Sequence, residues 1–309
     1  MFTKLQDEFI SLIDSRRAHV VHLPAIIFVY GGPMRQNFET PSPSMRDTFV
    51  NWAHNNNHKV AALLHMPEEY PEWNQFNGYD DLVEFERDAG CLSRAILLFL
   101  ESPGGFAELG AFCVDAVLAE RLFIVLYSKF YRANSFIDLG PLRLLKRVHG
   151  DFQAICPVDG SSLDDLEEVA ADIANEVLAK SNRLPKQQIF DPIQIRDQLL
   201  LISDLVELFG ALSKAEIKKL LEFFEVKLST SRLEQVLNLL CLLKVITLSD
   251  HLTRVFFTPP KSNRESFISF KLLESDSQLN RVKFKFKAIA AMKQDSFRRQ
   301  AYEKVHGRQ

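Results

Sequence analysis

Residues 95–112 constrain the fold of this chain more than any other stretch. Six apolar residues, 95–100, are followed by Glu101, by the turn Ser-Pro-Gly-Gly and by a helical pattern that contains Glu108. An uninterrupted apolar run bounded by turn residues is typical of a strand buried on both faces of a parallel sheet. We therefore predict that Glu101 ends a central strand and that Glu108 lies about one turn into the next helix. Open α/β sheets place their ligands at this edge.

The first 182 residues alternate between strand-like and helix-like segments. We expect strands at 19–30, 59–64, 95–100, 122–127 and 154–157, and helices at 3–17, 46–56, 80–93, 106–120 and 162–180. Such alternation predicts an α/β fold of the flavodoxin or Rossmann type, in which helices cover both faces of a mostly parallel sheet. Residues 1–182 are the first expected domain.

A linker at 181–188 leads to a second expected domain, residues 190–309. Its pattern predicts helices at 194–209, 214–224 and 230–243, then a hairpin of 245–248 and 255–258, which together indicate a winged helix. Residues 186–309 hold 21 Lys and Arg against 14 Asp and Glu, whereas the whole chain has a net charge of −3. The first 185 residues are therefore strongly acidic, and this split favours two domains with different partners.

The composition excludes several classes of protein. With 47% hydrophobic residues the chain can build real cores, yet no apolar stretch approaches the ~20 residues of a membrane span. The N-terminus shows no apolar signal core, and the four cysteines have no paired spacing. We therefore expect a cytoplasmic protein with reduced thiols, no membrane contact and no metal.

The residues around 101–108 also indicate a chemistry. The turn Pro103-Gly104-Gly105 can present backbone N–H groups to an anion, and Gly31-Gly32 allows a ligand close to the backbone. A helix N-terminus favours the ionised form of Glu108, and a carboxylate placed there suits an oxocarbenium-like sugar carbon. Glu101 can accept hydrogen bonds from sugar hydroxyls. The alternative, that Glu108 is a structural acid at a helix start, has equal weight on these residues alone.

The segment 104–110, Gly-Gly-Phe-Ala-Glu-Leu-Gly, resembles the Glu-Leu-Gly element of nucleoside deoxyribosyltransferases, whose Glu is the covalent nucleophile. Residues 101–112 resemble more closely the bacterial retron effectors of the deoxyribosyltransferase-like type, and the match extends to 135–145 and to Gly31-Gly32. This resemblance implies a deoxyribosyltransferase-like domain followed by a winged helix. It further implies an anti-phage toxin that cleaves an N-glycosidic bond, with NAD as the expected substrate and no resident cofactor.

The resemblance also implies roles and partners. Glu108 would be the nucleophile or the oxocarbenium stabiliser, and Glu86 matches a family acid, although it is equally well explained as a solvated helix residue. The residues expected to line the nucleotide are Glu101, Ser102, Pro103, Gly104, Gly105, Gly31 and Gly32. The retron reverse transcriptase and its branched RNA–DNA product, the msDNA, would hold the toxin inactive in an oligomeric complex.

The sequence leaves several alternatives open. The classical transferases have an Asp-rich element before the Glu, and its replacement by Glu101 favours hydrolysis, to nicotinamide and ADP-ribose, over transfer between bases. The open alternatives are deoxyribosyl transfer, ADP-ribosyl transfer to another acceptor, and a non-enzymatic, nucleotide-sensing DNA-binding regulator.

Basic residues of the second domain are candidates for nucleic-acid contacts. They are Arg232 at the start of the expected recognition helix, Lys283, Lys285 and Lys287 along one face of an expected edge strand, and the pair Arg298-Arg299. The alternatives are a lysine-protected sheet edge and a winged helix that docks a protein. In the first domain Arg143, Lys146 and Arg147 could contact a diphosphate or the msDNA, or form a solvated helix face.

Overall fold

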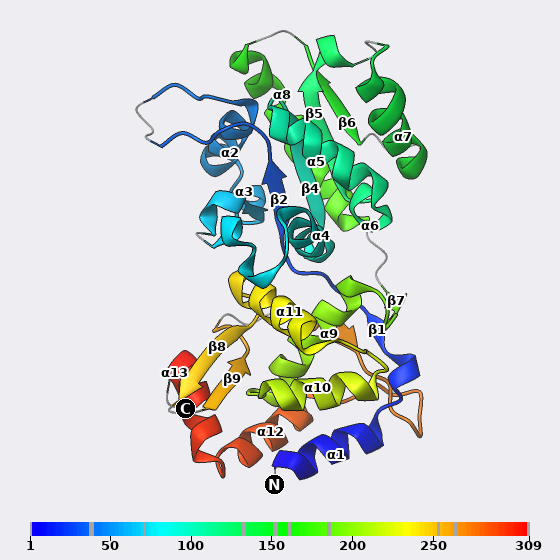
Figure 1. Cartoon of the computed structure of the whole chain (residues 1–309), viewed down its shortest axis with the longest axis vertical. Coiled ribbons are helices and arrows are strands. Elements are labelled where there is room, and N and C mark those ends of the chain that lie inside the picture. The colour runs from blue at the N-terminus through cyan, green and yellow to red at the C-terminus, as the bar shows by residue number, and fades with distance from the viewer. Residues whose placement is uncertain are drawn as a thin grey trace. The chain divides into compact units, whose positions relative to one another are not determined.

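The computed structural model describes residues 2–36, 40–70, 72–131, 134–150, 154–159, 162–183, 187–251, 254–261 and 265–307. The chain divides into two compact units (Figure 1). The first, which we call the sheet unit, comprises Ala25–Asn74 and Asp81–Leu184. The second, which we call the helical unit, comprises Met1–Pro24, Gln75–Asp80 and Pro185–Gln309. The first 24 residues, which the sequence analysis placed in the first domain, therefore pack in the second unit.

The sheet unit contains the expected parallel sheet, with five strands in the order β3-β2-β4-β5-β6. The strands are β2 (Ile27–Tyr30), β3 (Leu64–His65), β4 (Ala95–Leu100), β5 (Leu122–Tyr127) and β6 (Ile155–Val158). All six residues of β4 are buried, as the apolar run predicts. The strand order reverses between β2 and β4, so their carboxyl ends are the topological switch point at which such sheets bind ligands.

Helices cover both faces of this sheet (Figure 1). They are α2 (Met45–Asn56), α3 (His58–Ala61), α4 (Leu82–Leu92), α5 (Pro103–Val114), α6 (Ala116–Ala119), α7 (Arg143–His149) and α8 (Leu163–Asn182), with the short helical turns η2 (Pro67–Glu69), η3 (Trp73–Gly78), η4 (Ser128–Phe130) and η5 (Asp138–Leu142). Side chains of β2 alternate between the faces. Ile27 and Val29 pack in the core under α2 and α8, whereas Tyr30 contacts Phe112 of α5.

Two expected strands of this region are corrected. Residues 19–30 form two strands, because Pro24 cannot donate to a strand ladder and the chain passes there from one unit to the other. The first, β1 (His19–Val20), belongs to the helical unit. Residues 59–64 form α3 before β3, since the Asn57 side chain accepts the Val60 N–H and caps a helix.

The helical unit combines a small antiparallel sheet, a hairpin and helices. Its elements are α1 (Phe2–Leu12), η1 (Ser15–Arg17), β1, β7 (Gln188–Ile189), α9 (Ile195–Phe209), α10 (Lys214–Phe223), α11 (Thr230–Leu242), β8 (Thr247–His251), β9 (Arg254–Thr258), β10 (Ile268–Ser269), α12 (Arg281–Met292) and α13 (Ser296–His306). The order of α9, α10, α11 and the β8–β9 hairpin follows the predicted pattern, and its assignment as a winged helix stays a prediction.

Phenylalanine packing explains why α1 belongs to this unit. Phe9 is fully buried, and its ring centroid lies 5.4 Å from that of Phe209, 5.5 Å from that of Phe270 and 5.6 Å from that of Phe284. These edge-on contacts join α1 to three segments from the last third of the chain. The helix periodicity of residues 3–17 was readable, but its partners lie near the other end of the chain.

The expected edge strand at 281–287 is wrong, because these residues begin α12. The Asn280 side chain caps the helix by accepting the Lys283 N–H, and Phe284 and Ala288, four residues apart, are its buried face. In this helix Lys283 and Lys287, four residues apart, share one face and Lys285 lies on another, so the three lysines do not form one stripe. Within the described residues no helix is long and apolar enough to cross a bilayer.

A buried arginine closes the end of α4 and provides a test of the fold. The guanidinium of Arg121, 2% exposed, donates to the carbonyls of Gly90, Cys91 and Ser93. Arg121→Met would remove this donor from the buried carbonyls of Cys91 and Ser93, whereas that of Gly90 keeps the N–H and hydroxyl of Ser93. We expect the free energy of unfolding in urea to fall by about 2–4 kcal/mol. The exposed Lys59→Met is the control, and an equal loss in both variants would contradict this role.

Candidate active site

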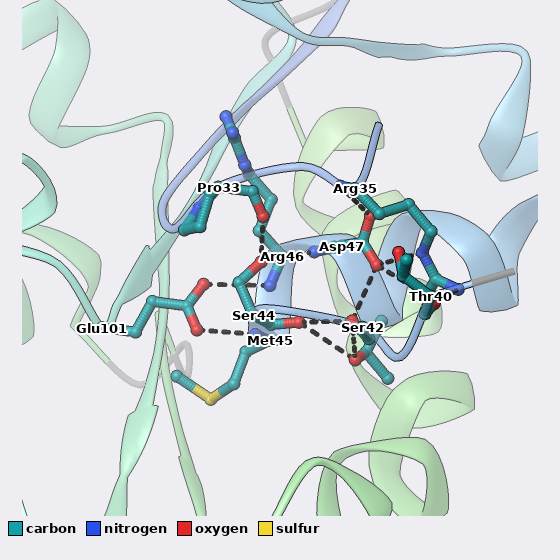
Figure 2. A network of polar contacts seen from close by, with 10 residues as sticks. Pro33, Arg35, Thr40, Ser42, Ser44, Met45, Arg46, Asp47 and Glu101 are labelled. Atoms are coloured by element: carbon teal, nitrogen blue, oxygen red, sulfur yellow. Dashed lines mark hydrogen bonds and ion pairs between the residues drawn. The ribbon is translucent and has the colours of Figure 1, made fainter. Parts of the chain in front are cut away.

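Glu101, which follows β4, connects this strand end to the segment after β2 and to the start of α2. One of its oxygens accepts the N–H of Gly32 at 3.0 Å and that of Arg46 at 3.0 Å, and the other accepts the N–H of Met45 at 2.6 Å. Figure 2 shows this carboxylate directed at the first turn of α2. The negative charge satisfies helix-start donors and complements the helix dipole. The geometry gives Glu101, which was expected to bind sugar hydroxyls, a positioning role.

The two glycines after β2 are required by the same contact. A Cβ at Gly32 would lie 2.7 Å from the Cβ of Ser44 and 2.8 Å from the Glu101 carboxylate. Gly31 has a φ of +150°, and its Cβ would lie 2.8 Å from the Cβ of Phe99. Close packing of protein on protein therefore explains both glycines, whose expected role was close approach to a ligand.

A second carboxylate, Asp47, holds the other end of the β2–α2 loop (Figure 2). It accepts the backbone N–H of Arg35 at 2.9 Å, pairs with the Arg35 guanidinium at 2.6 Å and accepts the hydroxyl of Ser42 at 2.7 Å. Although burial opposes ionisation, these bonds lower the pKa of Asp47. The loop is thus fixed at both of its ends by buried charge.

The expected anion cradle at the start of α5 is largely occupied by its own cap. The Ser102 hydroxyl accepts the Gly105 N–H at 3.1 Å, the Ser102 carbonyl accepts the N–H of Phe106 at 3.2 Å, and Pro103 has no N–H. Within the described residues this leaves Gly104 as the donor of the turn that has no acceptor. One free N–H can orient a hydroxyl or a phosphate oxygen, but it is not a full cradle.

Glu108, on the second turn of α5, is a half-buried residue whose carboxylate lacks a full set of partners. Its Oε2 is inaccessible to solvent and has no hydrogen-bond partner in the described part of the chain. Burial raises the pKa of Glu108 to about 7, against the opposing effect of Arg46, and Glu68 adds to the rise. The helix dipole was expected to favour ionisation, but desolvation outweighs it.

Glu86 on α4 belongs to the same cluster, as expected. It accepts the indole N–H of Trp73 at 3.1 Å and is 7% exposed. Burial raises the pKa of Glu86 to about 7, and the charges of Glu108 and Glu68 contribute to the rise. A solvated helix acid, the alternative explanation, does not fit this burial. A carboxylate whose pKa is raised by burial and by neighbouring carboxylates is typical of functional sites.

Three residues of the cluster were missed by the sequence analysis. Tyr30 is fully buried, its hydroxyl has no partner within the described residues, and its pKa is raised by burial and by the charges of Glu86, Glu108 and Glu68. Arg46 pairs with Glu68 at 2.6 Å, while its buried Nε lacks an acceptor among the described atoms. The only available signal was position, since Tyr30 ends a strand and Arg46 starts a helix.

The predicted nucleic-acid residues are largely engaged within the helical unit. Lys285 pairs with Glu207, and Lys287 pairs with Glu8. Arg298 is 5% exposed and pairs with Glu216 at 2.9 Å. The remaining three are Arg299, 3.8 Å from Glu303, Arg232, whose guanidinium lies 5.4 Å from the ring of Tyr79, and Lys283, which is exposed. Their role in nucleic-acid binding stays a prediction.

Comparison with known proteins agrees with this layout. A family model described as STM3845 retron effector protein matches residues 42–248. The chain is 29% identical over 135 residues to the Escherichia coli protein "Retron Ec86 putative ribosyltransferase/DNA-binding protein", which covers 41% of this chain and 42% of the relative. Its retron Ec73 counterpart from Escherichia coli is 28% identical over 151 residues, 45% of this chain and 48% of the relative. The chain thus matches less than half the length of these two relatives.

The Glu101 contact predicts a large loss of stability on substitution. In Glu101→Gln the charge is lost and the amide N–H₂ group faces backbone donors, so at least one buried N–H loses its acceptor. We expect the free energy of unfolding in urea at pH 7 to fall by about 2–4 kcal/mol. The exposed Glu167→Gln of α8 is the matched control, and an unchanged stability of Glu101→Gln would contradict the positioning role.

The raised pKa of Glu108 predicts the opposite result for that residue. Its pKa in the folded state lies above the ordinary value of 4.5, so the folded protein binds more protons between pH 4.5 and about 7, and its stability falls as pH rises through this window. Glu108→Gln should therefore stabilise the protein by about 1–3 kcal/mol at pH 8. At pH 5 urea unfolding should show a much smaller gain, and a gain that is the same at both pH values would contradict the assignment.

Proposed function

The chain belongs to the STM3845 retron effector family, and we propose that it acts in that family as an enzyme that breaks an N-glycosidic bond. The observation that carries this proposal is the buried Oε2 of Glu108, which has no hydrogen-bond partner among the described residues. An unpartnered carboxylate oxygen is costly in a folded protein, so it is retained where a ligand group completes it. Its place at the switch point of the sheet supports the same conclusion.

The reaction that we propose is hydrolysis at a sugar anomeric carbon. The bond from C1′ to the base nitrogen breaks, and its electron pair leaves with the base. Ionised Glu108 stabilises the oxocarbenium-like centre or forms a transient bond to it. Water then adds to C1′, and Glu86, with its raised pKa, can accept the water's proton. Glu101, Gly31 and Gly32 hold the frame of this site during these steps.

The charges of the cluster support NAD as the substrate. Glu86 interacts electrostatically with Glu108 and Glu68, and Arg46 is the cation that acts on Glu108 and pairs with Glu68. Carboxylates therefore outnumber cations around the position proposed for the sugar. A pyridinium leaving group carries a positive charge in the ground state and passes it to the sugar in the transition state. Such a substrate is favoured by this cluster at every stage, whereas a neutral nucleoside gains only in the transition state. The products would be nicotinamide and ADP-ribose.

A second outcome of the same chemistry is transfer to another acceptor. Both relatives are named as putative ribosyltransferases. The carboxylate of Glu108 could equally serve deoxyribosyl or ADP-ribosyl transfer. Incubation with NAD labelled in the adenosine part separates the two outcomes, because hydrolysis yields free ADP-ribose and transfer yields a labelled acceptor. We further propose that the reverse transcriptase and msDNA of the retron hold the enzyme inactive. The assay should therefore be run with the full chain alone and in that complex.

The proposed role of Glu108 predicts a loss of activity together with a defined pH dependence. Nicotinamide release, measured by chromatography, should fall at least about 100-fold in Glu108→Gln, because the group that stabilises the sugar cation is removed. Only the ionised carboxylate is active, so kcat/KM should rise with pH and reach half its maximum near pH 7, the pKa of Glu108. Glu68→Gln removes a like charge and should move this midpoint to lower pH.

The control for this experiment is Glu167→Gln, an exposed acid on α8, which should retain full activity. An active Glu108→Gln would overturn the assignment of the catalytic group. The assay is run with NAD and with nucleosides, on the free chain and on the complex. If no free base and no labelled product forms in any of these, the result would favour a non-enzymatic nucleotide sensor.

A further inference from the structure

The segment that follows β5 concentrates positive charge in the acidic part of the chain. Between residues 129 and 150 there are five Lys and Arg and a single acid, Asp138. On α7 the side chains of Arg143, Lys146 and Arg147 are exposed, and within the described residues none of them forms an ion pair. They differ in this from Lys285 and Lys287 of α12, whose charges are neutralised by neighbouring carboxylates.

Aromatic rings lie among these cations. Phe136 is 83% exposed, and its ring lies over Gly140, where a Cβ would be 3.7 Å away. Lys129 Nζ lies 5.0 Å from the ring centroid of Phe130, and Lys146 Nζ lies 4.5 Å from that of Tyr131. The exposed ring of Phe136 precedes the cations of α7 by about two helical turns, and packing does not explain exposure to this extent.

We propose that this surface, formed by Lys129, Phe130, Phe136, Arg143, Lys146 and Arg147, binds single-stranded nucleic acid. Alternating rings and cations match a strand whose bases stack on aromatic faces and whose phosphates meet basic side chains. A duplex hides the faces of its bases, so the rings favour an unpaired strand. An acidic protein would satisfy the cations, but it would leave the exposed ring of Phe136 unexplained. This inference does not depend on the glycosidic reaction.

The test is fluorescence anisotropy of a labelled oligothymidine of about 12 nucleotides with the full chain. Arg143→Ala/Arg147→Ala should weaken binding at least about fivefold at 50 mM salt. It should also flatten the dependence of log Kd on log salt by about 1.4, because each phosphate contact on a single strand contributes about 0.7. Phe136→Ala should weaken binding at least about fivefold through lost stacking. All three side chains are exposed, so these variants should fold.

The matched control is Lys218→Ala/Lys293→Ala, which removes two exposed charges outside this surface and should change the affinity less than twofold. An equal loss in the control would show that the attraction is non-specific and would overturn the proposal. The same holds if the chain binds no strand at about 50 mM salt, if Phe136→Ala binds normally, or if a duplex binds more tightly than the single strand. Nicotinamide release is measured separately, so failure of either proposal is recognised on its own.

Discussion

The hydrogen bonds that one carboxylate, Glu101, accepts determine how the candidate site at the carboxyl ends of β2 and β4 is built. A strand end, a loop and a helix start meet there, and each contributes a backbone N–H that would otherwise be buried without an acceptor. Because both oxygens are engaged, these segments are held at a fixed separation. Gly32 is required for the same reason, since any side chain would collide with the carboxylate. The site is therefore set before a ligand arrives, as rigid functional sites require.

Within that frame the remaining carboxylates are placed at an energetic cost. Glu108 and Glu86 are removed from water, and the nearest guanidinium, that of Arg46, is paired with Glu68. Both carboxylates therefore bind protons more tightly than in water, and the hydroxyl of Tyr30 adds a further unsatisfied group. Glu101 and Glu108 are seven residues apart, yet the first stabilises the fold through hydrogen bonds and the second destabilises it through desolvation. Local environment, and not residue type, separates the two roles.

The sequence predicted the secondary structure around the candidate site wherever its signal was local. The apolar run 95–100, the turn after it and the spacing to Glu108 together specify a strand, a loop and a helix, and these formed as expected. Glu86 was nominated as a site residue through the resemblance to a known family. Tyr30 and Arg46 were missed because their role depends on the pairing of β2 with β4, a contact between distant segments. The role of Glu101 also depends on that pairing, because its carboxylate accepts the N–H of Gly32, which follows β2.

Where the prediction of structure failed, a period-two pattern competed with other signals. Lys and Phe alternate at 283–286, which suggests a strand, yet Asn280 caps a helix and the alanines from 288 onward continue it. In the helix Lys285 and Lys287 reach carboxylates on α9 and α1, so two charges that looked available are neutralised. Net charge along a sequence therefore does not locate a polyanion surface, because pairing in three dimensions decides which charges remain. In this chain the unpaired cations of α7 lie in the acidic part, which a count of charges would have excluded.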